Sequence, residues 1–261
     1  MITMASSQEK PQLIVDGKRL DGRDAGDLRP ISIQTNVVKN AVGSAYIEWG
    51  NNKIIAAVYG PKEALPKHTA NPERAVIKCR YAMSPFSSLE DHGRTGPNRR
   101  ATEISKVTRE VFENVVMLEK FPGSEIDIYV EVLQADGGTR AAGVTAAAVA
   151  MATSGIPMTD LPFGVSIGKI GETIVVDLNK IEDNYSDADV PMVISPRQDK
   201  ILLLQMDGNM TKDNIKEAID LAKKAGETIS KLQSDALRAP YLEVMEKYKG
   251  EKSSYDEKQA D

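Results

Sequence analysis

The chain has 261 residues, 41% of them hydrophobic and 27% charged, which allows a sizeable core and is ordinary for a globular protein rather than a disordered or membrane one. Its net charge of −5 means that any nucleic-acid role must depend on a local basic patch, because the overall field does not attract a polyanion. A single cysteine excludes an internal disulfide, and one cysteine with two histidines cannot supply the usual four ligands of a structural zinc site.

The two ends of the chain differ in composition from its middle. Residues 1–10 lack the basic patch and apolar core of a secretory signal, so we expect a flexible leader and a cytoplasmic protein. Residues 241–261 are charged and poor in large apolar side chains, which favours a mobile tail. Residues 11–240 contain no linker and no strong internal repeat, so we expect them to form a single domain.

Strands are expected first along the chain. Residues 44–59 hold two β-rich runs around the tripeptide GNN at positions 50–52, which is a hairpin signature. A third β-rich run covers residues 74–83 and includes Cys79, which we expect to be a buried strand residue.

An amphipathic helix is predicted over residues 101–121, after the polar and turn-rich segment RTGPNRR at 94–100. Its apolar residues recur at spacings of three and four, as one buried helical stripe requires. These residues are Ile104, Val107, Val111, Val115 and Leu118. Pro122 and Gly123 end the helix.

A strand, a glycine turn and a helix follow in direct succession. Apolar and charged or aromatic residues alternate over 126–132, which predicts a strand with one buried face. This strand runs into the segment QADGGTR at 134–140. The next segment, 141–155, is dense in small residues, as expected of a helix packed closely against its neighbours.

Two strand pairs and a long helix complete the pattern. The pairs are 164–170 with 173–178, and 191–195 with 201–206. The final helix spans about 212–237. Thr211 is its expected N-cap residue. Strands that bracket helices, with hairpins on both sides, indicate a mixed α+β fold.

The segment QADGGTR has the features of an anion site. A glycine turn that opens a helix points unpaired backbone N–H groups at one spot, where the helix dipole also favours negative charge. Gly138 lies in this turn, Thr139 adds a hydroxyl, and Arg140 adds a planar cation suited to phosphate. A plain strand-to-helix turn with a surface arginine explains the same residues equally well, so both interpretations stay open at this point.

Several basic residues could bind a polyanion. Arg99 and Arg100 stand just before or at the start of a predicted helix, and adjacent arginines on a loop can grip successive phosphates of a strand. Lys67 and His68 could extend such a basic path. Solvated surface charges are the simpler interpretation of both groups.

Four carboxylates gather in the segment IEDNYSDADVP at 181–191, which is turn-rich and lies between predicted strands. Oxygen-rich clusters of this kind suit magnesium, and a carboxylate can instead serve as a general acid. Asp183 and Asp189 are the candidates for these roles. A hydrophilic loop without any function is the alternative.

Taken together, the segments DGKRLDGR, NRRATEIS, QADGGTR and EDNYSDADVP occur in an order that resembles the RNase PH family of phosphorolytic 3′-exoribonucleases. Within that family, the chain is most similar to the catalytic ring subunit of the archaeal exosome. The resemblance covers roughly residues 11–240. It implies a mixed α+β fold of the ribosomal protein S5 domain 2-like type.

The resemblance also implies roles for the candidate residues. Gly138, Thr139 and Arg140 match the phosphate-binding turn of the family. Arg99 and Arg100 match the paired arginines that hold the RNA 3′ end. Asp183 and Asp189 match two catalytic aspartates that are associated with a divalent metal, Mg²⁺ or Mn²⁺.

The implied reaction uses inorganic phosphate as co-substrate and releases nucleoside diphosphates from single-stranded RNA, with 3′ tailing as the reverse reaction. The implied partners are a homologous non-catalytic subunit in a hexameric ring, built as a trimer of dimers, and RNA-binding cap proteins. Three alternatives stay open: a homohexameric RNase PH that trims tRNA 3′ ends, a non-catalytic RNA-binding ring subunit, and an unrelated phosphate-binding α+β protein.

Overall fold

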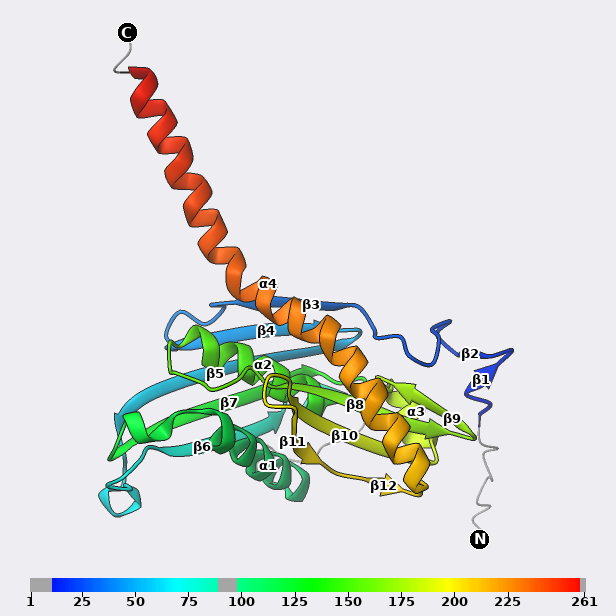
Figure 1. Ribbon diagram of the computed structural model, residues 1–261. Coiled ribbons are helices and arrows are strands. Elements are labelled where there is room, and N and C mark those ends of the chain that lie inside the picture. The colour runs from blue at the N-terminus through cyan, green and yellow to red at the C-terminus, as the bar shows by residue number, and fades with distance from the viewer. Residues whose placement is uncertain (1–10, 89–97, 259–261) are drawn as a thin grey trace.

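A long, curved sheet forms one side of the molecule, with strand order β3-β4-β5-β7-β6 (Figure 1). The computed structural model describes residues 11–88 and 98–258. The strands of this sheet are β3 (Ile31–Thr35), β4 (Gly43–Trp49), β5 (Asn52–Glu63), β6 (Val76–Met83) and β7 (Ser124–Gln134). The predicted hairpin is confirmed as β4 and β5, which turn at Gly50 with φ +56°. Cys79 lies in β6 as predicted, although it is only half-buried.

Helix α1 (Arg99–Val115) connects β6 to β7, and these two strands are parallel because the chain crosses over between them. The Asn98 side chain caps the helix by accepting a hydrogen bond of 2.7 Å from the Ala101 N–H. The predicted stripe is buried except for Val107, which is half-buried. The buried residues of α1 are Ile104, Thr108, Val111, Phe112 and Val115.

The predicted end of this helix at residue 121 is wrong, because α1 stops at Val115. Leu118 belongs to a separate short turn, η2 (Leu118–Lys120). The cause is a tertiary contact that the local pattern does not contain. The Met117 N–H donates to the Pro157 carbonyl at 3.0 Å, which holds the chain in an extended path after the helix.

A second sheet has the order β11-β10-β8-β9, and β12 also pairs with β10. Its strands are β8 (Phe163–Ile170), β9 (Thr173–Val176), β10 (Ala188–Ser195), β11 (Lys200–Leu204) and β12 (Asp207–Gly208). Both predicted strand pairs are confirmed, since β8 pairs with β9 and β10 with β11. A two-stranded ribbon, β1 (Ile14–Val15) with β2 (Lys18–Arg19), precedes the sheets in the chain.

The segment 181–191 is more regular than its turn-rich sequence predicts. Asp183 lies in a short helix, α3 (Lys180–Tyr185), and Asp189 lies in β10. The helix starts with a capping box. In this box the Asn179 side chain accepts from the Glu182 N–H, and the Glu182 carboxylate accepts from the Asn179 N–H, each at 3.0 Å. A helix of six residues is too short to show an apolar period in the sequence.

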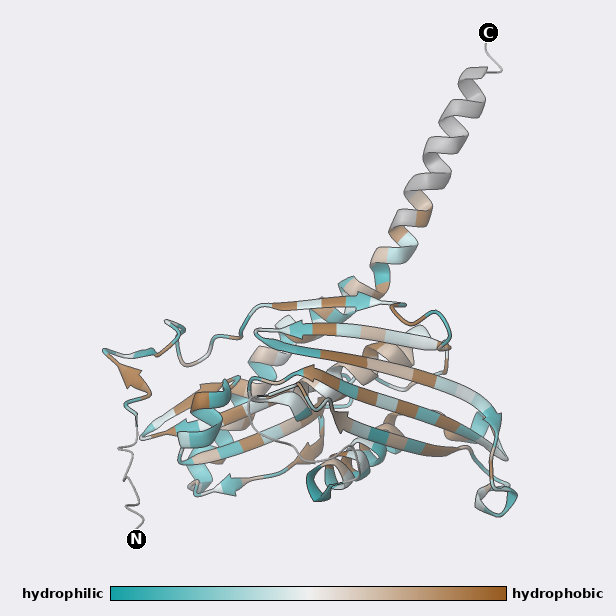
Figure 2. Cartoon of the chain, turned by 180° about the vertical axis from the view of Figure 1, so that it is seen from behind, coloured by the Kyte–Doolittle hydropathy of each residue, from teal (hydrophilic) through white to brown (hydrophobic). Residues whose placement is uncertain are grey.

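Helix α2 (Thr139–Thr153) packs against both sheets and is almost wholly buried. Glycines of the two sheets permit the close approach: a Cβ added to Gly43 of β4 would lie 2.2 Å from the Ala150 carbonyl oxygen, and one on Gly164 of β8 would lie 2.5 Å from that of Ala141. Apolar and polar bands alternate along the long strands (Figure 2), and the apolar residues of both sheets join one core. The predicted mixed α+β class is confirmed.

Helix α4 (Lys212–Lys258) begins as predicted, with the Thr211 hydroxyl accepting from the Asn214 N–H at 3.2 Å. It does not end near residue 237, because the helix continues through Pro240 and projects away from the sheets (Figure 1). Proline disfavours a helix, but the lysines and glutamates that follow it are good helix formers. The mobility of residues 241–261 stays a prediction, and residues 1–10 and 259–261 lie outside the described part.

None of the helices in the described part of the chain combines the length and the apolar character that crossing a membrane requires.

Candidate active site

The QADGGTR segment forms the turn that joins β7 to α2. Gly137 and Gly138 have φ of +71° and +69°, a backbone region that glycine adopts without strain. A Cβ on Gly137 would lie 2.6 Å from the backbone carbon of Asn179. Gly138 is the N-cap of α2 and makes no side-chain capping bond. The first N–H groups of the helix therefore have no cap from that position and are suited to an anion.

Two residues far away in the sequence hold this turn in place. Asn52 of β5 donates to the Gly137 carbonyl and accepts from the Asp136 N–H, both at 2.6 Å. Arg29 donates to the Asp136 carbonyl at 2.5 Å and forms a buried ion pair with Asp177. The sequence indicated neither as a site residue, because Asn52 was notable only as part of the hairpin signature and Arg29 carries no local signal.

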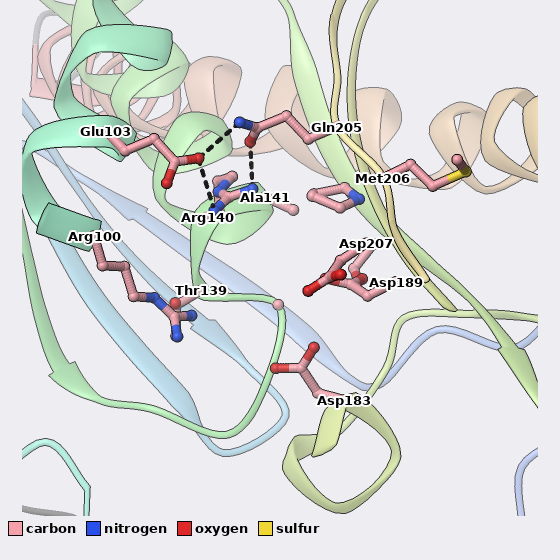
Figure 3. Close-up of a pocket in the computed structure, with 13 residues that line it drawn as sticks. Arg100, Glu103, Thr139, Arg140, Ala141, Asp183, Asp189, Gln205, Met206 and Asp207 are labelled. Carbon is pink, nitrogen blue, oxygen red and sulfur yellow. Dashed lines mark hydrogen bonds and ion pairs between the residues drawn. The ribbon is translucent and has the colours of Figure 1, made fainter. Parts of the chain in front are cut away.

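The turn opens into a cavity of about 420 Å³ between α1, α2, α3 and the second sheet (Figure 3). Six predicted site residues line it together: Arg100, Gly138, Thr139, Arg140, Asp183 and Asp189. The structure also brings in residues that the sequence did not indicate: Glu103, Ser166, Gln205 and Asp207. Arg99 is exposed at the start of α1 and does not line the cavity.

Thr139 is buried, and its hydroxyl is positioned by a residue of β6. The Tyr81 hydroxyl donates to Thr139 Oγ1 at 2.9 Å. Burial raises the pKa of Tyr81, so this side chain remains a neutral hydrogen-bond donor at ordinary pH. Because Tyr81 donates, the hydrogen of the Thr139 hydroxyl is available to a ligand in the cavity.

The two aspartates approach the cavity from different elements. Burial raises the pKa of Asp183, and the positive charges of Arg100 and Arg140 oppose this shift. Burial and the negative charge of Asp183 raise the pKa of Asp189 to about 6, whereas a hydrogen bond from Ser166 lowers it. Two interacting carboxyl groups of this kind titrate as a pair and can share one proton.

The RLDGR segment at the start of the chain supports α3 from behind. Arg19 donates to Glu182 from Nε at 2.7 Å and from Nη2 at 2.5 Å, and both side chains are fully buried. Arg23 lies beside the same carboxylate at 3.6 Å. Since Glu182 also belongs to the capping box of α3, this ion pair fixes the helix that carries Asp183.

Lys67 and His68 lie outside the cavity, in the exposed 3-10 turn η1 (Lys67–Thr69). Strand β5 ends beside the first residues of β7, so η1 lies near the beginning of β7. The glycine turn lies at the other end of β7. The 11 residues of β7 separate the two places by roughly 35 Å. The RNA-binding role expected for Lys67 and His68 stays a prediction, and so do the individual roles expected for the residues in the cavity.

The chain matches known proteins along most of its length. The 3′ exoribonuclease family RNase PH matches with its domain 1 at residues 27–157 and with its domain 2 at residues 160–225. The Exosome complex component Rrp41 of Pyrococcus furiosus is 53% identical over 235 residues, which are 90% of this chain and 94% of that protein. Its counterpart in Thermoplasma volcanium is 53% identical over 226 residues, 87% of this chain and 91% of that protein.

Two solved structures have the same fold. Rice Rrp46 superimposes with a TM-score of 0.76 at 24% identity, covering 84% of this chain and 100% of that one. The Archaeoglobus fulgidus exosome with RNA bound to the active site gives a TM-score of 0.71 at 22% identity, covering 83% of this chain and 92% of the matched one. The expected family resemblance is confirmed: with both family domains matched in order, the chain belongs to the RNase PH family of 3′ exoribonucleases.

Proposed function

We propose that this chain shortens single-stranded RNA from its 3′ end, with orthophosphate as the attacking group. The observation that carries the proposal is that one cavity contains the start of α2 with Arg140, the cation Arg100, and the carboxyl pair Asp183 and Asp189. A helix start with an arginine suits a free phosphate, and a second arginine suits a phosphate of the RNA. Membership of a 3′ exoribonuclease family supports the same activity.

The reaction exchanges one phosphorus–oxygen bond for another. An oxygen of orthophosphate bonds to the last phosphorus of the RNA, and the bond from that phosphorus to the 3′ oxygen of the preceding nucleotide breaks. The 3′ oxygen leaves with a proton, and a nucleoside 5′-diphosphate is released. Because phosphate rather than water attacks, the reaction is a phosphorolysis and not a hydrolysis. The bonds exchanged are similar, so the reverse reaction can add a 3′ tail from nucleoside diphosphates.

Catalysis then rests on positioning and charge neutralisation, as in other phosphoryl transfers. Gly138, Thr139 and Arg140 hold the orthophosphate. Arg100, which lines the cavity, and Arg99, its exposed neighbour in α1, hold the RNA backbone. One of the two aspartates, Asp183 or Asp189, in its protonated form supplies the proton that the departing 3′ oxygen takes.

A divalent cation, Mg²⁺ or Mn²⁺, fits the same carboxyl pair. The described residues contain no group of three or more Asp, Glu, His or Cys side chains arranged to hold an ion. Magnesium is commonly bound through only one or two carboxylates together with substrate phosphates. Asp183 and Asp189 can provide the two carboxylates. When bound, the ion would neutralise charge on the reacting phosphoryl oxygens.

The proposed assembly follows from the names of the relatives, which are exosome components. We infer that the chain alternates with a homologous non-catalytic subunit in a hexameric ring, a trimer of dimers, and that RNA-binding cap proteins join it. Lys67 and His68 are exposed outside the cavity, where they would contact RNA before its 3′ end enters. A cytoplasmic location stays a prediction.

The test is a phosphorolysis assay with the chain alone and with its homologous subunit. Single-stranded RNA, Mg²⁺ and orthophosphate should yield nucleoside diphosphates, and only when phosphate is present. Arg140→Ala and Asp183→Asn should abolish the reaction, whereas Lys106→Met, on the exposed face of α1, should not change it. Full activity of the unaided chain would point to a homohexameric RNase PH instead. Release of monophosphates without added phosphate would contradict the proposal.

A further inference from the structure

The guanidinium of Arg140 is held by two side chains that come from other elements. Gln205, which follows β11, accepts a hydrogen bond from Arg140 Nη1 through its Oε1. Glu103 of α1 lies 3.7 Å from Arg140 Nη2. Gln205 Nε2 also donates to Glu103 Oε1 at 2.8 Å, which closes a triangle of three side chains (Figure 3).

The orientation of the Gln205 amide follows from the chemistry of its two neighbours. An ionised carboxylate only accepts hydrogen bonds, and a guanidinium only donates them. The NH₂ group of Gln205 must therefore face Glu103, and its carbonyl oxygen must face Arg140. Gln205 is thus the one member of the triangle that both donates and accepts, and it links two groups of fixed polarity.

Arg140 keeps donors free for a ligand in this arrangement. A guanidinium has five N–H groups, and the hydrogen bond to Gln205 occupies one of them, on Nη1, while Glu103 lies beside Nη2 as an ion-pair partner at 3.7 Å. The Nε–H of Arg140 is buried and has no partner among the described residues. A buried donor without a partner is uncommon in a folded protein, and Arg140 is one of the residues that line the cavity.

The presence of Glu103 in this cavity requires an explanation, because a carboxylate repels the phosphate that the cavity is proposed to bind. The contacts of Glu103 supply this explanation: it forms an ion pair with Arg140, and it accepts a hydrogen bond from Gln205, which itself accepts from Arg140. A planar guanidinium binds phosphate well only when its fork is correctly oriented. Restraint from two sides fixes that orientation before the ligand arrives.

We propose that Gln205 and Glu103 are positioning residues that orient Arg140 for the attacking orthophosphate. This inference rests on the proposed function, and it adds two residues from outside the glycine turn to the control of phosphate affinity. Their loss should weaken phosphate binding while RNA binding is unchanged, because neither contacts Arg100 or the carboxyl pair through any hydrogen bond that the structure describes.

The first test is Gln205→Met, which keeps the length of the side chain and removes both hydrogen bonds. In the assembly that phosphorolyses RNA, the KM for phosphate should rise about tenfold, with the KM for RNA within about twofold of the wild-type value. The matched control is Gln198→Met, since Gln198 Nε2 donates to Thr159 Oγ1 at 2.9 Å outside the cavity. This control should leave both constants unchanged.

The second test exchanges the carboxylate of Glu103 and the amide of Gln205. Gln205→Glu alone places two carboxylates side by side and should raise the KM for phosphate further than Gln205→Met. The double variant Glu103→Gln/Gln205→Glu restores one carboxylate that accepts from Arg140 and one amide that donates to that carboxylate. It should recover phosphate affinity to within about threefold of the wild-type value. A role in folding stability alone predicts no such recovery in the KM for phosphate.

Titration of each variant with orthophosphate by calorimetry separates this inference from the proposed function. Equal phosphate affinity of the wild type and Gln205→Met, or a double variant no better than Gln205→Glu, overturns the positioning role. Phosphate binding that weakens in Gln205→Met and recovers in the double variant, in a protein that never phosphorolyses RNA, supports the positioning role and overturns the proposed function. A wild type that binds no phosphate overturns both.

Discussion

The Ser166 hydroxyl of β8 donates a hydrogen bond of 2.9 Å to Oδ1 of Asp189 on the neighbouring strand β10. This bond stabilises the ionised form of a carboxyl group whose burial and negative neighbour favour the neutral form. Ser166 therefore lowers the pKa of Asp189, against the upward shift from burial and from Asp183.

Ser166→Ala should move the ionisation of Asp189 upward from about 6, because the hydrogen bond that lowers its pKa is lost. The limb of the pH–rate profile that reports this group should shift to higher pH by ~0.5–1 unit. The measurement is kcat/KM for RNA between pH 5 and 9. The control is Ser124→Ala, which removes a hydroxyl at the end of β7 away from the glycine turn and should leave the pH–rate profile unchanged. An unshifted profile in Ser166→Ala would show that Asp189 does not control this limb.

Asp189→Asn should make the protein more stable at pH 8 while removing its activity. The folded state raises the pKa of Asp189 from 3.8 to about 6, so folding takes up a proton between these values. The cost of the ionised group therefore grows as the pH rises through this window and is complete above it. We expect Asn to stabilise the fold by ~1–2 kcal/mol at pH 8 and by much less at pH 4. Urea unfolding at both pH values measures the difference, and equal effects at the two would contradict the shift.

Tyr81→Phe removes only the hydroxyl that donates to Thr139. The buried threonine loses its partner, so the free energy of unfolding should fall by ~1–3 kcal/mol and the KM for phosphate should rise. Tyr46→Phe is the matched control, because its hydroxyl donates to Glu48 in a more exposed place, at 2.9 Å. Thermal unfolding and phosphate kinetics of the two variants are compared. A Tyr81→Phe protein with the phosphate kinetics of Tyr46→Phe would remove Tyr81 from the phosphate site.

Gly137→Ala tests how closely the turn approaches the start of α3. Gly137 and Gly123 have the same φ, +71°, but only Gly137 has neighbouring backbone within 4 Å of an added Cβ, at 2.6 Å. Gly123→Ala should cost ~1 kcal/mol from its backbone conformation alone. Gly137→Ala should cost several times more and abolish activity, because the turn must move. Urea midpoints and RNA cleavage decide this, and similar losses in both variants would show that the turn accommodates the methyl group.

Arg19→Leu should destabilise the fold by ~3–5 kcal/mol, because it leaves the Glu182 carboxylate buried without its main partner. Activity should fall with it, since Glu182 fixes the helix that carries Asp183. The neighbouring Lys18 forms an exposed pair with Asp24, with side chains 55% and 61% exposed. Lys18→Met should therefore change stability by less than ~1 kcal/mol. Equal effects of the two changes on urea unfolding would be evidence against the anchoring role of the buried pair.

The parts of the fold that the sequence predicted well are those with a local cause. The hairpin at Gly50, the alternating strand that became β7, and the N-cap Thr211 all depend on neighbours in the chain. The early end of α1 could not be predicted, because Met117 bonds to Pro157, 40 residues further along. Helix α3 is too short to show a period, and Pro240 marks no helix end because favourable residues follow it.

In the candidate site, too, features with a local cause could be predicted and those set by tertiary contacts could not. Arg140, Asp183 and Asp189 carry charge in recognisable motifs, and the structure brings them into one cavity. Gln205 and Tyr81 carry no motif, and they matter only because the fold places them beside Arg140 and Thr139. Residues that act directly can be predicted from chemical type, whereas residues that orient them become visible only through three-dimensional contacts.

Helix α2 begins at the glycine turn and is buried between the two sheets along nearly its whole length. Its first turn can move only if the packing of both sheets is disturbed, so the N–H groups at its start are held rigid by the core. A ligand that binds there meets a surface that is already ordered and loses little affinity to conformational entropy. By mass action, the same ligand should protect the whole domain against unfolding, by ~2.7 kcal/mol at one hundred times its Kd.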